Sequence, residues 1–223
     1  MPAFQRNVFL WLEQGGVYAM ACLRGGGEYG ETWHEAGMRE KKQNVFDDFI
    51  AAGEYLIANR YTSAARLAIQ GGSNGGLLVG AVLTQRPDLC RAVVCQVPLL
   101  DMIRYHRFLI AKLWIPEYGS ADDPAQFRTL WSYSPYHRVV DGRNYPAVLL
   151  ATAESDSRVA PLHARKMAAR LQAATGSGLP VLLRIESKAG HGAGKPITKV
   201  VDEYTDIYSF LFSQLGMTYK ESM

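Results

Sequence analysis

A glycine-rich hexapeptide, Gly71–Gly76, separates a short apolar run at 67–69 from a longer apolar run at 77–83. A short apolar run followed at once by glycines and then by a longer apolar run predicts a strand, a sharp turn and a helix. Ser73 lies inside this turn, with a glycine two residues away on either side. A serine on a strained turn needs small neighbours, because a Cβ at either glycine is expected to collide with the adjoining strand or helix. The hexapeptide therefore predicts one βα unit that presents one hydroxyl group.

Apolar runs and amphipathic runs alternate along most of the remaining chain. The predicted strands span 17–22, 66–70, 91–97, 146–152 and 180–185, and the predicted helices span 3–14, 44–59, 74–85, 162–174 and 197–215. Strands that alternate with helices form a parallel sheet covered on both faces. The pattern therefore predicts a single α/β domain over residues 1–223.

Residues 101–145 interrupt this alternation. The segment is rich in aromatic residues and prolines, which predicts short helices and loops instead of one regular element. In an open α/β sheet the active groups lie at the carboxyl ends of the strands. We therefore expect residues 101–145 to form an excursion over the active site.

The composition is that of an ordinary soluble globular protein, with 48% hydrophobic and 20% charged residues. A net charge of +3 is too small to indicate a nucleic-acid partner. The chain has no apolar run of about 18 residues, so no membrane span is expected. The first residues lack the pattern of a signal peptide, which makes a cytoplasmic location the default expectation.

Cysteines and histidines give no sign of a metal or cofactor. The three cysteines, Cys22, Cys90 and Cys95, are an odd number and lie in or beside apolar runs. We interpret them as small core residues in a reducing compartment. No His, Cys and Asp cluster has the spacing of a metal site.

The pattern Gly-x-Ser-x-Gly between a strand and a helix is typical of the nucleophile elbow of the α/β-hydrolases. In that fold an acid and a histidine follow the serine, each in a loop after a later strand. Asp156 follows strand 146–152, and His191 follows strand 180–185 between two glycines. We therefore predict Ser73 as nucleophile, His191 as general base and Asp156 as the acid that orients it. Glu154 is the alternative acid, and a plain surface histidine is the alternative for His191.

Two features are candidates for stabilising an oxyanion. The amide of Asn74 lies at the start of the predicted helix, where the helix dipole favours negative charge. The loop Arg24–Gly30 contains three consecutive glycines, like the oxyanion loop of lipases, but it follows a strand that already has a helix before it. We prefer Asn74 as the donor and interpret the glycine loop as a tight turn that brings backbone segments together.

Four segments together resemble the catalytic domain of the prolyl oligopeptidase family of serine peptidases. They are residues 24–34, 71–76, 156–163 and 188–196. The resemblance implies the same three catalytic residues and Asn74 as an oxyanion donor. It also implies that Trp114 stacks on a substrate proline ring and that Arg158 donates to the preceding carbonyl. The resemblance places the other pocket residues at Asn74, Leu99, Tyr118 and Val159.

The chain also departs from that family. Family members carry a β-propeller and earlier strands, including a tyrosine that acts as second oxyanion donor, and this sequence contains neither. We therefore expect an N-terminally truncated hydrolase domain with a weakened oxyanion hole. The truncation leaves the predicted strand 17–22 near a sheet edge, which predicts a homo-oligomer formed through that edge.

Three functions remain open from the sequence. The leading one is a serine hydrolase that cleaves short peptides after proline through an acyl-enzyme. A carboxylesterase for small acyl esters is the first alternative, because activated esters need less transition-state stabilisation than amides. A non-catalytic truncated module is the second. None of them requires a nucleic-acid or membrane partner.

Overall fold

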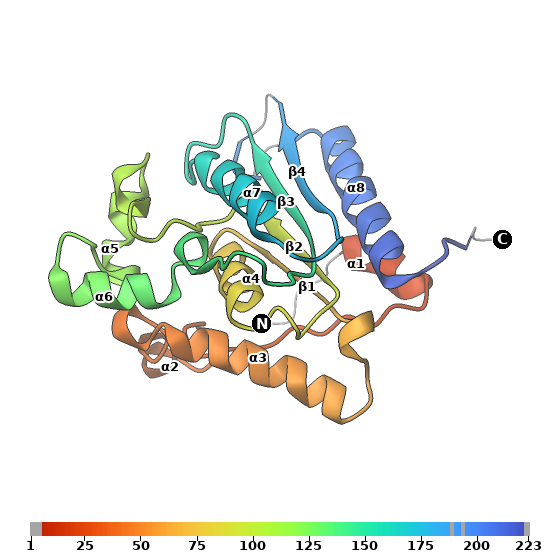
Figure 1. The fold of residues 1–223 in the computed structure, drawn as a ribbon, viewed down its shortest axis with the longest axis horizontal. Helices are drawn as coiled ribbons and strands as arrows, with labels where there is room; N and C mark the ends of the chain where they lie inside the picture. Colours follow the sequence, from red (N-terminus) through yellow and green to blue (C-terminus); the bar gives the residue numbers. More distant parts are fainter. Residues whose placement is uncertain (1–5, 188–189, 193–194, 221–223) are drawn as a thin grey trace.

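The computed structural model describes residues 6–187, 190–192 and 195–220, and it confirms the α/β class (Figure 1). Its centre is a four-stranded sheet in the order β1-β2-β3-β4. Each neighbouring pair of strands is parallel, so the carboxyl ends of all four strands lie along one edge. The strands are β1 (Ala68–Gly72), β2 (Ala92–Gln96), β3 (Ala147–Ala153) and β4 (Val181–Glu186).

The helices agree closely with the amphipathic runs of the sequence. They are α1 (Arg6–Glu13), α2 (Glu31–Glu35), α3 (Gln43–Ala58), α4 (Asn74–Gln85), α5 (Ile115–Tyr118), α6 (Pro124–Tyr133), α7 (Leu162–Ala174) and α8 (Ile197–Leu215). The four helices predicted after residue 40 are confirmed to within a residue at each end. The helix predicted from residue 3 is observed from Arg6, and residues 3–5 lie outside the described part.

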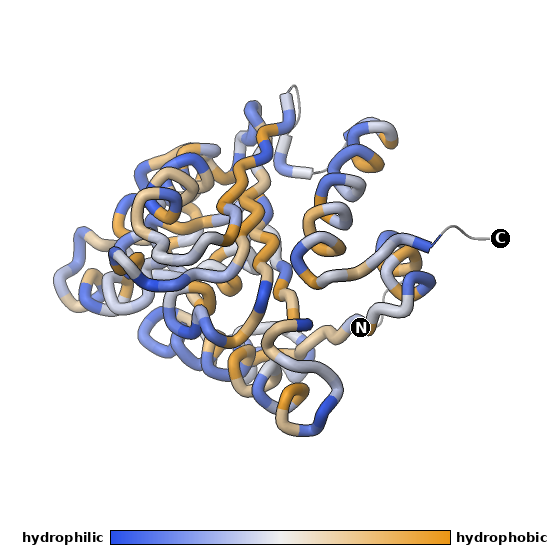
Figure 2. Tube along the Cα trace, turned by 45° about the vertical axis from the view of Figure 1, so that its right-hand side comes forward, coloured by the Kyte–Doolittle hydropathy of each residue, from blue (hydrophilic) through white to orange (hydrophobic). Residues whose placement is uncertain are grey.

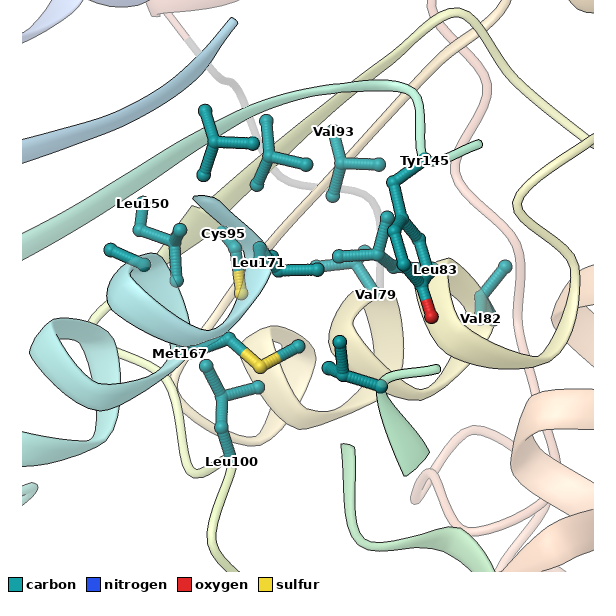
Figure 3. Close-up of a cluster of buried hydrophobic side chains, with 14 of the residues drawn as sticks. Val79, Val82, Leu83, Val93, Cys95, Leu100, Tyr145, Leu150, Met167 and Leu171 are labelled. Atoms are coloured by element: carbon teal, nitrogen blue, oxygen red, sulfur yellow. The ribbon is translucent and has the colours of Figure 1, made fainter. Parts of the chain in front are cut away.

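One face of the sheet is covered by α4 and α7. Successive strands step to the next position in the same direction, and right-handed crossovers then place the connecting helices on one face. Figure 3 shows the buried cluster between them, in which Val79 of α4, Val93 of β2, Leu150 of β3 and Met167 of α7 point toward one another. The helix α3 packs in turn on α4, and Figure 1 shows it outside α4.

The other face is covered by α8. Ala92 and Val94 of β2 pack with Ile207 and Leu211 of α8, whereas Val93 between them belongs to the α4 side. Alternate residues of one strand are therefore buried on opposite faces, which explains why the central strands β2 and β3 are apolar almost throughout. Figure 2 shows hydrophobic stretches along the extended segments in the middle of the trace.

The predicted strand 17–22 is wrong. Residues 16–23 form no ladder in the described structure, and the side chains of Val17 and Met20 are 76% and 60% exposed. An apolar run becomes a strand only where another strand accepts its backbone hydrogen bonds. Here the carbonyl of Val17 instead accepts a hydrogen bond from the indole of Trp11 at 3.1 Å. The expected homo-oligomer loses this supporting observation and stays a prediction.

The three cysteines differ in burial. Cys90 and Cys95 are buried, as expected of small core residues, but Cys22 is exposed and the expectation that it lies in the core is wrong. Because residues 16–23 do not enter the sheet, the side chain of Cys22 has no sheet face to pack against.

Residues 101–145 form short helices and turns, including α5 and α6, on the side of the molecule where α3 lies (Figure 1). Their buried side chains join a second cluster with Phe46 of α3 and Leu77 of α4. The segment thus packs against the helix that begins at the glycine-rich turn.

Neither a membrane-spanning helix nor a metal-ligand cluster occurs among the described residues. None of the helices placed in the structure combines the length and apolarity needed to cross a bilayer. Within the same residues, no three or more His, Cys, Asp or Glu side chains gather as a metal-ligand set.

Candidate active site

Ser73 lies in a strained turn between β1 and α4. Its φ of 57° and ψ of −115° lie in a region that L-residues rarely occupy, and such strain typically costs about 1–3 kcal/mol. The surrounding structure holds the residue from both sides. Its amide donates to the carbonyl of Gln96 in β2 at 2.9 Å, and its carbonyl accepts from the amide of Leu77 in α4 at 3.1 Å. The turn therefore fixes the Ser73 backbone at the carboxyl end of the sheet.

The glycines around Ser73 have different roles from those expected. A Cβ on Gly71 would lie 2.2 Å from the carbonyl oxygen of Gly75, so a larger residue there would force the backbone of the turn to shift. A Cβ on Gly75, in contrast, would meet nothing within 4 Å, and the expected collision there is wrong. The second close approach is at Gly76, where a Cβ would lie 2.7 Å from Pro98. Close packing therefore favours glycine at two places. At Gly71 the end of β1 lies against the first turn of α4, and at Gly76 the helix lies against the segment that follows β2.

Asp156, His191 and Ser73 lie in one line of contacts. His191 Nδ1 is 2.6 Å from Asp156 Oδ2, and His191 Nε2 is 3.1 Å from Ser73 Oγ. An ionised carboxylate can only accept a hydrogen bond, so Nδ1–H is the donor and Nε2 remains free to accept the proton of Ser73. The side chain of Asp156 is 0% exposed and that of His191 is 16% exposed. This is the arrangement that activates a hydroxyl for nucleophilic attack.

Two backbone amides of the loop after β3 hold the carboxylate of Asp156 in position for this contact. Its other oxygen, Oδ1, accepts hydrogen bonds from the amides of Arg158 at 2.8 Å and Val159 at 2.9 Å. Burial by itself raises the pKa of Asp156, but the hydrogen bonds from His191 and from these two amides outweigh it and leave the pKa lowered. The carboxylate is therefore ionised at neutral pH and faces the imidazole.

Glu154 does not take this place. Its amide donates to the carbonyl of Glu186 at 2.9 Å, which continues the pairing of β3 with β4, and its side chain is exposed. The carboxylate of Asp156, not that of Glu154, lies within hydrogen-bond distance of the imidazole of His191.

Asn74 follows Ser73 and begins α4. The first amides of a helix have no carbonyl partner within it, which makes the Asn74 amide available to an anion. The side-chain oxygen of Asn74 accepts a hydrogen bond from the hydroxyl of Tyr118 at 2.9 Å. The excursion at 101–145 therefore contacts the turn directly through Tyr118.

The predicted pocket residues lie close together, with one exception. Leu99, Tyr118 and Val159 belong to the same buried cluster, and Trp114 packs against it while remaining partly exposed. Arg158 is exposed next to Val159. The structure thus brings four of the five side chains into one cluster and leaves the guanidinium of the fifth open to solvent.

A cavity of about 390 Å³ contains Ser73 and His191. It is also lined by Val97, Lys195 and Glu203, which the sequence reasoning missed. Val97 has a φ of 38°, an outlier for a β-branched residue that no sequence pattern reveals. Lys195 Nζ lies 2.7 Å from Glu203 Oε2. Lys195 could have been found from the sequence, because this residue belongs to the glycine-rich motif around His191, but no such signal points to Glu203.

A second cavity, of about 170 Å³, lies beside Asn74 and Gly75. The glycine loop that begins at Arg24 lines its other side. This loop is tight, as predicted: a Cβ on Gly37 would lie 2.5 Å from the Cα of Gly25. The open space next to Gly75 explains why no Cβ collision occurs there.

Comparison with known proteins identifies the family of the chain. The family model described as the prolyl oligopeptidase family matches residues 2–218. A prolyl endopeptidase of Elizabethkingia miricola is 49% identical over 217 residues, which are 97% of this chain and 31% of that protein. A prolyl endopeptidase of Dictyostelium discoideum is 45% identical over 95% of this chain and 28% of its own length.

Solved structures give the same result. A structure from a study of two prolyl endopeptidases superposes with a TM-score of 0.94 and 56% identity, covering 96% of this chain and 32% of that one. A post-proline cleaving enzyme from Rickettsia typhi also has a TM-score of 0.94, at 36% identity, over 98% of this chain and 31% of its own. The chain thus spans about a third of the length of the relatives it matches. Because the match covers nearly the whole chain and includes the serine turn and the loops of Asp156 and His191, this chain belongs to the prolyl oligopeptidase family of serine peptidases.

Proposed function

We propose that the chain is a serine peptidase that cleaves short peptides on the carboxyl side of proline through an acyl-enzyme. The observation that carries the proposal is the line of contacts from Asp156 through His191 to Ser73, at 2.6 and 3.1 Å. The relatives named prolyl endopeptidase support the substrate class. Since they are about three times as long as this chain, their activity comes to it as part of the proposal.

In the first half-reaction, Ser73 Oγ attacks the carbonyl carbon of the scissile bond while its proton moves to His191 Nε2. The imidazolium that forms is stabilised by the carboxylate of Asp156. When the tetrahedral intermediate collapses, the C–N bond breaks and His191 gives the proton to the leaving amine. A water molecule, deprotonated by the same nitrogen, then hydrolyses the ester to Ser73.

The negative charge of the tetrahedral intermediate needs donors. Among the described residues, we assign the amide of Asn74, at the N-terminal end of α4, as one such donor. The amide of Ser73 is not available for this task, because it already donates to Gln96. In a comparable serine protease, loss of one such donor costs about 10²–10³ in kcat. The number of donors therefore decides whether amides or only activated esters are turned over.

The specificity for proline is assigned to the cluster beside the turn. A flat indole face suits a pyrrolidine ring, and Trp114 is partly exposed at the edge of this cluster. Arg158 is exposed at the loop of Asp156, where its guanidinium can donate to a substrate carbonyl. Leu99, Tyr118 and Val159, which are buried in the same cluster, are assigned to the apolar floor of the pocket.

The first test is labelling by a fluorophosphonate, which reacts with activated serines. We expect one adduct, on Ser73, and none in the Ser73→Ala variant. Ser213→Ala, an exposed serine of α8, is the matched control and should label like the parent chain. Absence of the adduct on Ser73 would contradict catalysis and favour a non-catalytic module.

The second test separates peptidase from esterase. Hydrolysis of a glycyl-proline amide is compared with hydrolysis of a p-nitrophenyl ester by the same preparation. Turnover of the amide, lost in Ser73→Ala, supports the proposal. Turnover of the ester with none of the amide would replace it by esterase activity.

A further inference from the structure

Helix α5, which carries Tyr118, is bound by side chains from the segment 31–42. The carboxylate of Glu117 accepts a hydrogen bond from Lys42 Nζ at 3.0 Å through Oε1. Its other oxygen lies 3.0 Å from His34 Nε2. Arg39 adds a third contact, because its Nε donates to the carbonyl of Pro116 at 2.9 Å. Three side chains of one segment therefore bind two consecutive residues of α5.

The Glu117–Lys42 pair is largely removed from solvent. The side chain of Lys42 is 2% exposed and that of Glu117 is 23% exposed. Burial lowers the pKa of Lys42, and the charge and hydrogen bond of Glu117 oppose that change. The hydrogen bonds of His34 to Glu117 and to Glu31 raise the pKa of the histidine. The Glu117 carboxylate thus favours the protonated form of both side chains.

A second set of contacts leads from this pair to the serine turn. Lys42 Nζ lies 5.0 Å from the ring centroid of Tyr118, within the range of a cation–π interaction. The hydroxyl of Tyr118 donates to Asn74 Oδ1 at 2.9 Å, and Asn74 follows Ser73. Trp114 directly precedes α5 and packs on the same cluster as Tyr118. The position of α5 therefore determines the positions of Trp114 and Tyr118 together.

Such a short helix depends on outside contacts for its position. It has four residues, one of them a proline without an amide donor, and a single helical turn is unstable in isolation. The three contacts from segment 31–42 supply what local structure does not. We propose that Glu117 is a positioning residue for the substrate pocket: by binding Lys42 and His34 it holds α5, and with it Trp114 and Tyr118, against the serine turn. This proposal rests on the proposed function, and Glu117 itself does not touch the reacting atoms.

The proposal has a consequence that a purely structural ion pair lacks. If Glu117 positions the pocket, its loss weakens recognition of the residue before the scissile bond more than it weakens the chemistry at Ser73. The ratio of kcat/KM for a glycyl-proline amide over a glycyl-alanine amide should then fall about tenfold, since small displacements of positioning groups have large effects. The rate of fluorophosphonate labelling, which requires no proline pocket, should change much less.

The experiment compares Glu117→Gln with Glu40→Gln, an exposed glutamate of the same segment, on the full 223-residue chain. Hydrogen exchange of the peptide that contains α5 is measured first. The amide of Gly119, which donates to the carbonyl of Ile115 at 2.8 Å, should exchange about tenfold faster in Glu117→Gln, because loss of the outside contacts lets α5 open locally. Glu40→Gln should exchange like the parent. The two kcat/KM values and the labelling rate are then determined for the same proteins.

Two further variants keep the test decisive if the buried Lys42 prevents Glu117→Gln from folding. The double variant Lys42→Met with Glu117→Gln removes both charges of the buried pair. The variant His34→Gln changes only the contact of His34 with Glu117 and leaves Lys42 paired with Glu117. Both variants should speed the exchange of the Gly119 amide and lower the proline-to-alanine ratio of kcat/KM, as Glu117→Gln does. The effect of His34→Gln should be the smaller one. Unchanged exchange at α5 in the folded variants overturns the proposal, and so does faster exchange with an unchanged proline-to-alanine ratio. If the parent chain does not label at Ser73, the proposed function is contradicted instead. The affinity for acetyl-glycyl-proline is then measured in place of kcat/KM. Equal affinity in the parent and the variants would overturn the positioning role.

Discussion

The carboxylate of Asp156 uses its two oxygens for two tasks: Oδ2 lies 2.6 Å from His191 Nδ1, while Oδ1 accepts the amides of Arg158 and Val159. The same side chain thus closes its own turn and orients the imidazole. Glutamate is one methylene longer and does not form this turn in the same way. The relationship explains why the structure selects Asp156 and leaves Glu154 in solvent.

Replacing Asp156 with Asn should lower kcat by about 10⁴, the loss seen for the equivalent change in a comparable triad. The amide can donate to Nδ1, which favours the imidazole tautomer that cannot accept the proton of Ser73. Glu154→Gln is the matched control and should leave kcat unchanged. Steady-state hydrolysis of a glycyl-proline amide measures both variants. A larger loss in Glu154→Gln than in Asp156→Asn would assign the acid to Glu154.

Gly71→Ala should destabilise the fold by roughly 1–3 kcal/mol, the usual cost of overpacking. The added Cβ would lie 2.2 Å from the carbonyl oxygen of Gly75, a backbone atom that cannot rotate away. Gly72→Ala is the control one residue along, where the nearest atoms are 3.7 Å away; it should change stability by no more than about 1 kcal/mol. Urea unfolding of the two variants measures the difference. Equal stability of the two would show that the turn relaxes without cost.

Trp114→Ala should raise KM for a proline substrate by about tenfold to a hundredfold, equivalent to roughly 1.5–3 kcal/mol of lost apolar contact. The indole supplies a flat face at the edge of the cluster that also holds Tyr118. Trp131→Ala is the control, because that ring is 42% exposed and stacks on Phe127. KM and kcat are compared for proline and alanine substrates. An equal loss in both tryptophan variants would point to general packing.

The stability of the chain should fall as the pH is lowered from about 6.5 to about 4, partly because of His163. Burial lowers the pKa of this histidine to about 4, more strongly than the nearby Asp101 raises it. In this pH range His163 binds a proton in the unfolded chain but not in the folded chain. Its contribution to the free energy of unfolding is therefore fully present above the pKa that the histidine has in the unfolded chain, and it is lost as the pH falls toward the folded pKa. The loss amounts to at most about 3 kcal/mol. His137, whose pKa burial also lowers, contributes with the same sign.

This pH dependence is measured by urea unfolding at pH 7 and pH 5. The ring of His163 accepts the amides of Leu100 and Asp101 at 3.3 and 3.1 Å, which requires an unprotonated Nδ1. His163→Gln retains an acceptor and should show a smaller loss of stability between the two pH values than the parent. An identical loss in both proteins would assign the dependence to other groups.

Local sequence was sufficient for most of the elements. The βα turn at Ser73, the helices α4, α7 and α8 and the four paired strands follow from apolar periodicity and from glycine, because these signals act over neighbouring residues. The three residues of the candidate site could be predicted for a related reason. Each lies just after a strand, and parallel strands bring their carboxyl ends to one edge.

The tertiary structure decided what depends on partners distant in the chain. Residues 16–23 have the composition of a strand but no ladder partner, and therefore form none. Gly75 has open space because of the cavity beside it, whereas Gly76 is close to Pro98 of a later segment. The contact of Lys42 with Glu117 joins residues 75 positions apart, and no periodicity encodes it. The sequence by itself determined which residues are candidates for the proposed chemistry. Only the packing of distant segments decided which of them meet, because burial and hydrogen bonding are properties of the folded neighbourhood.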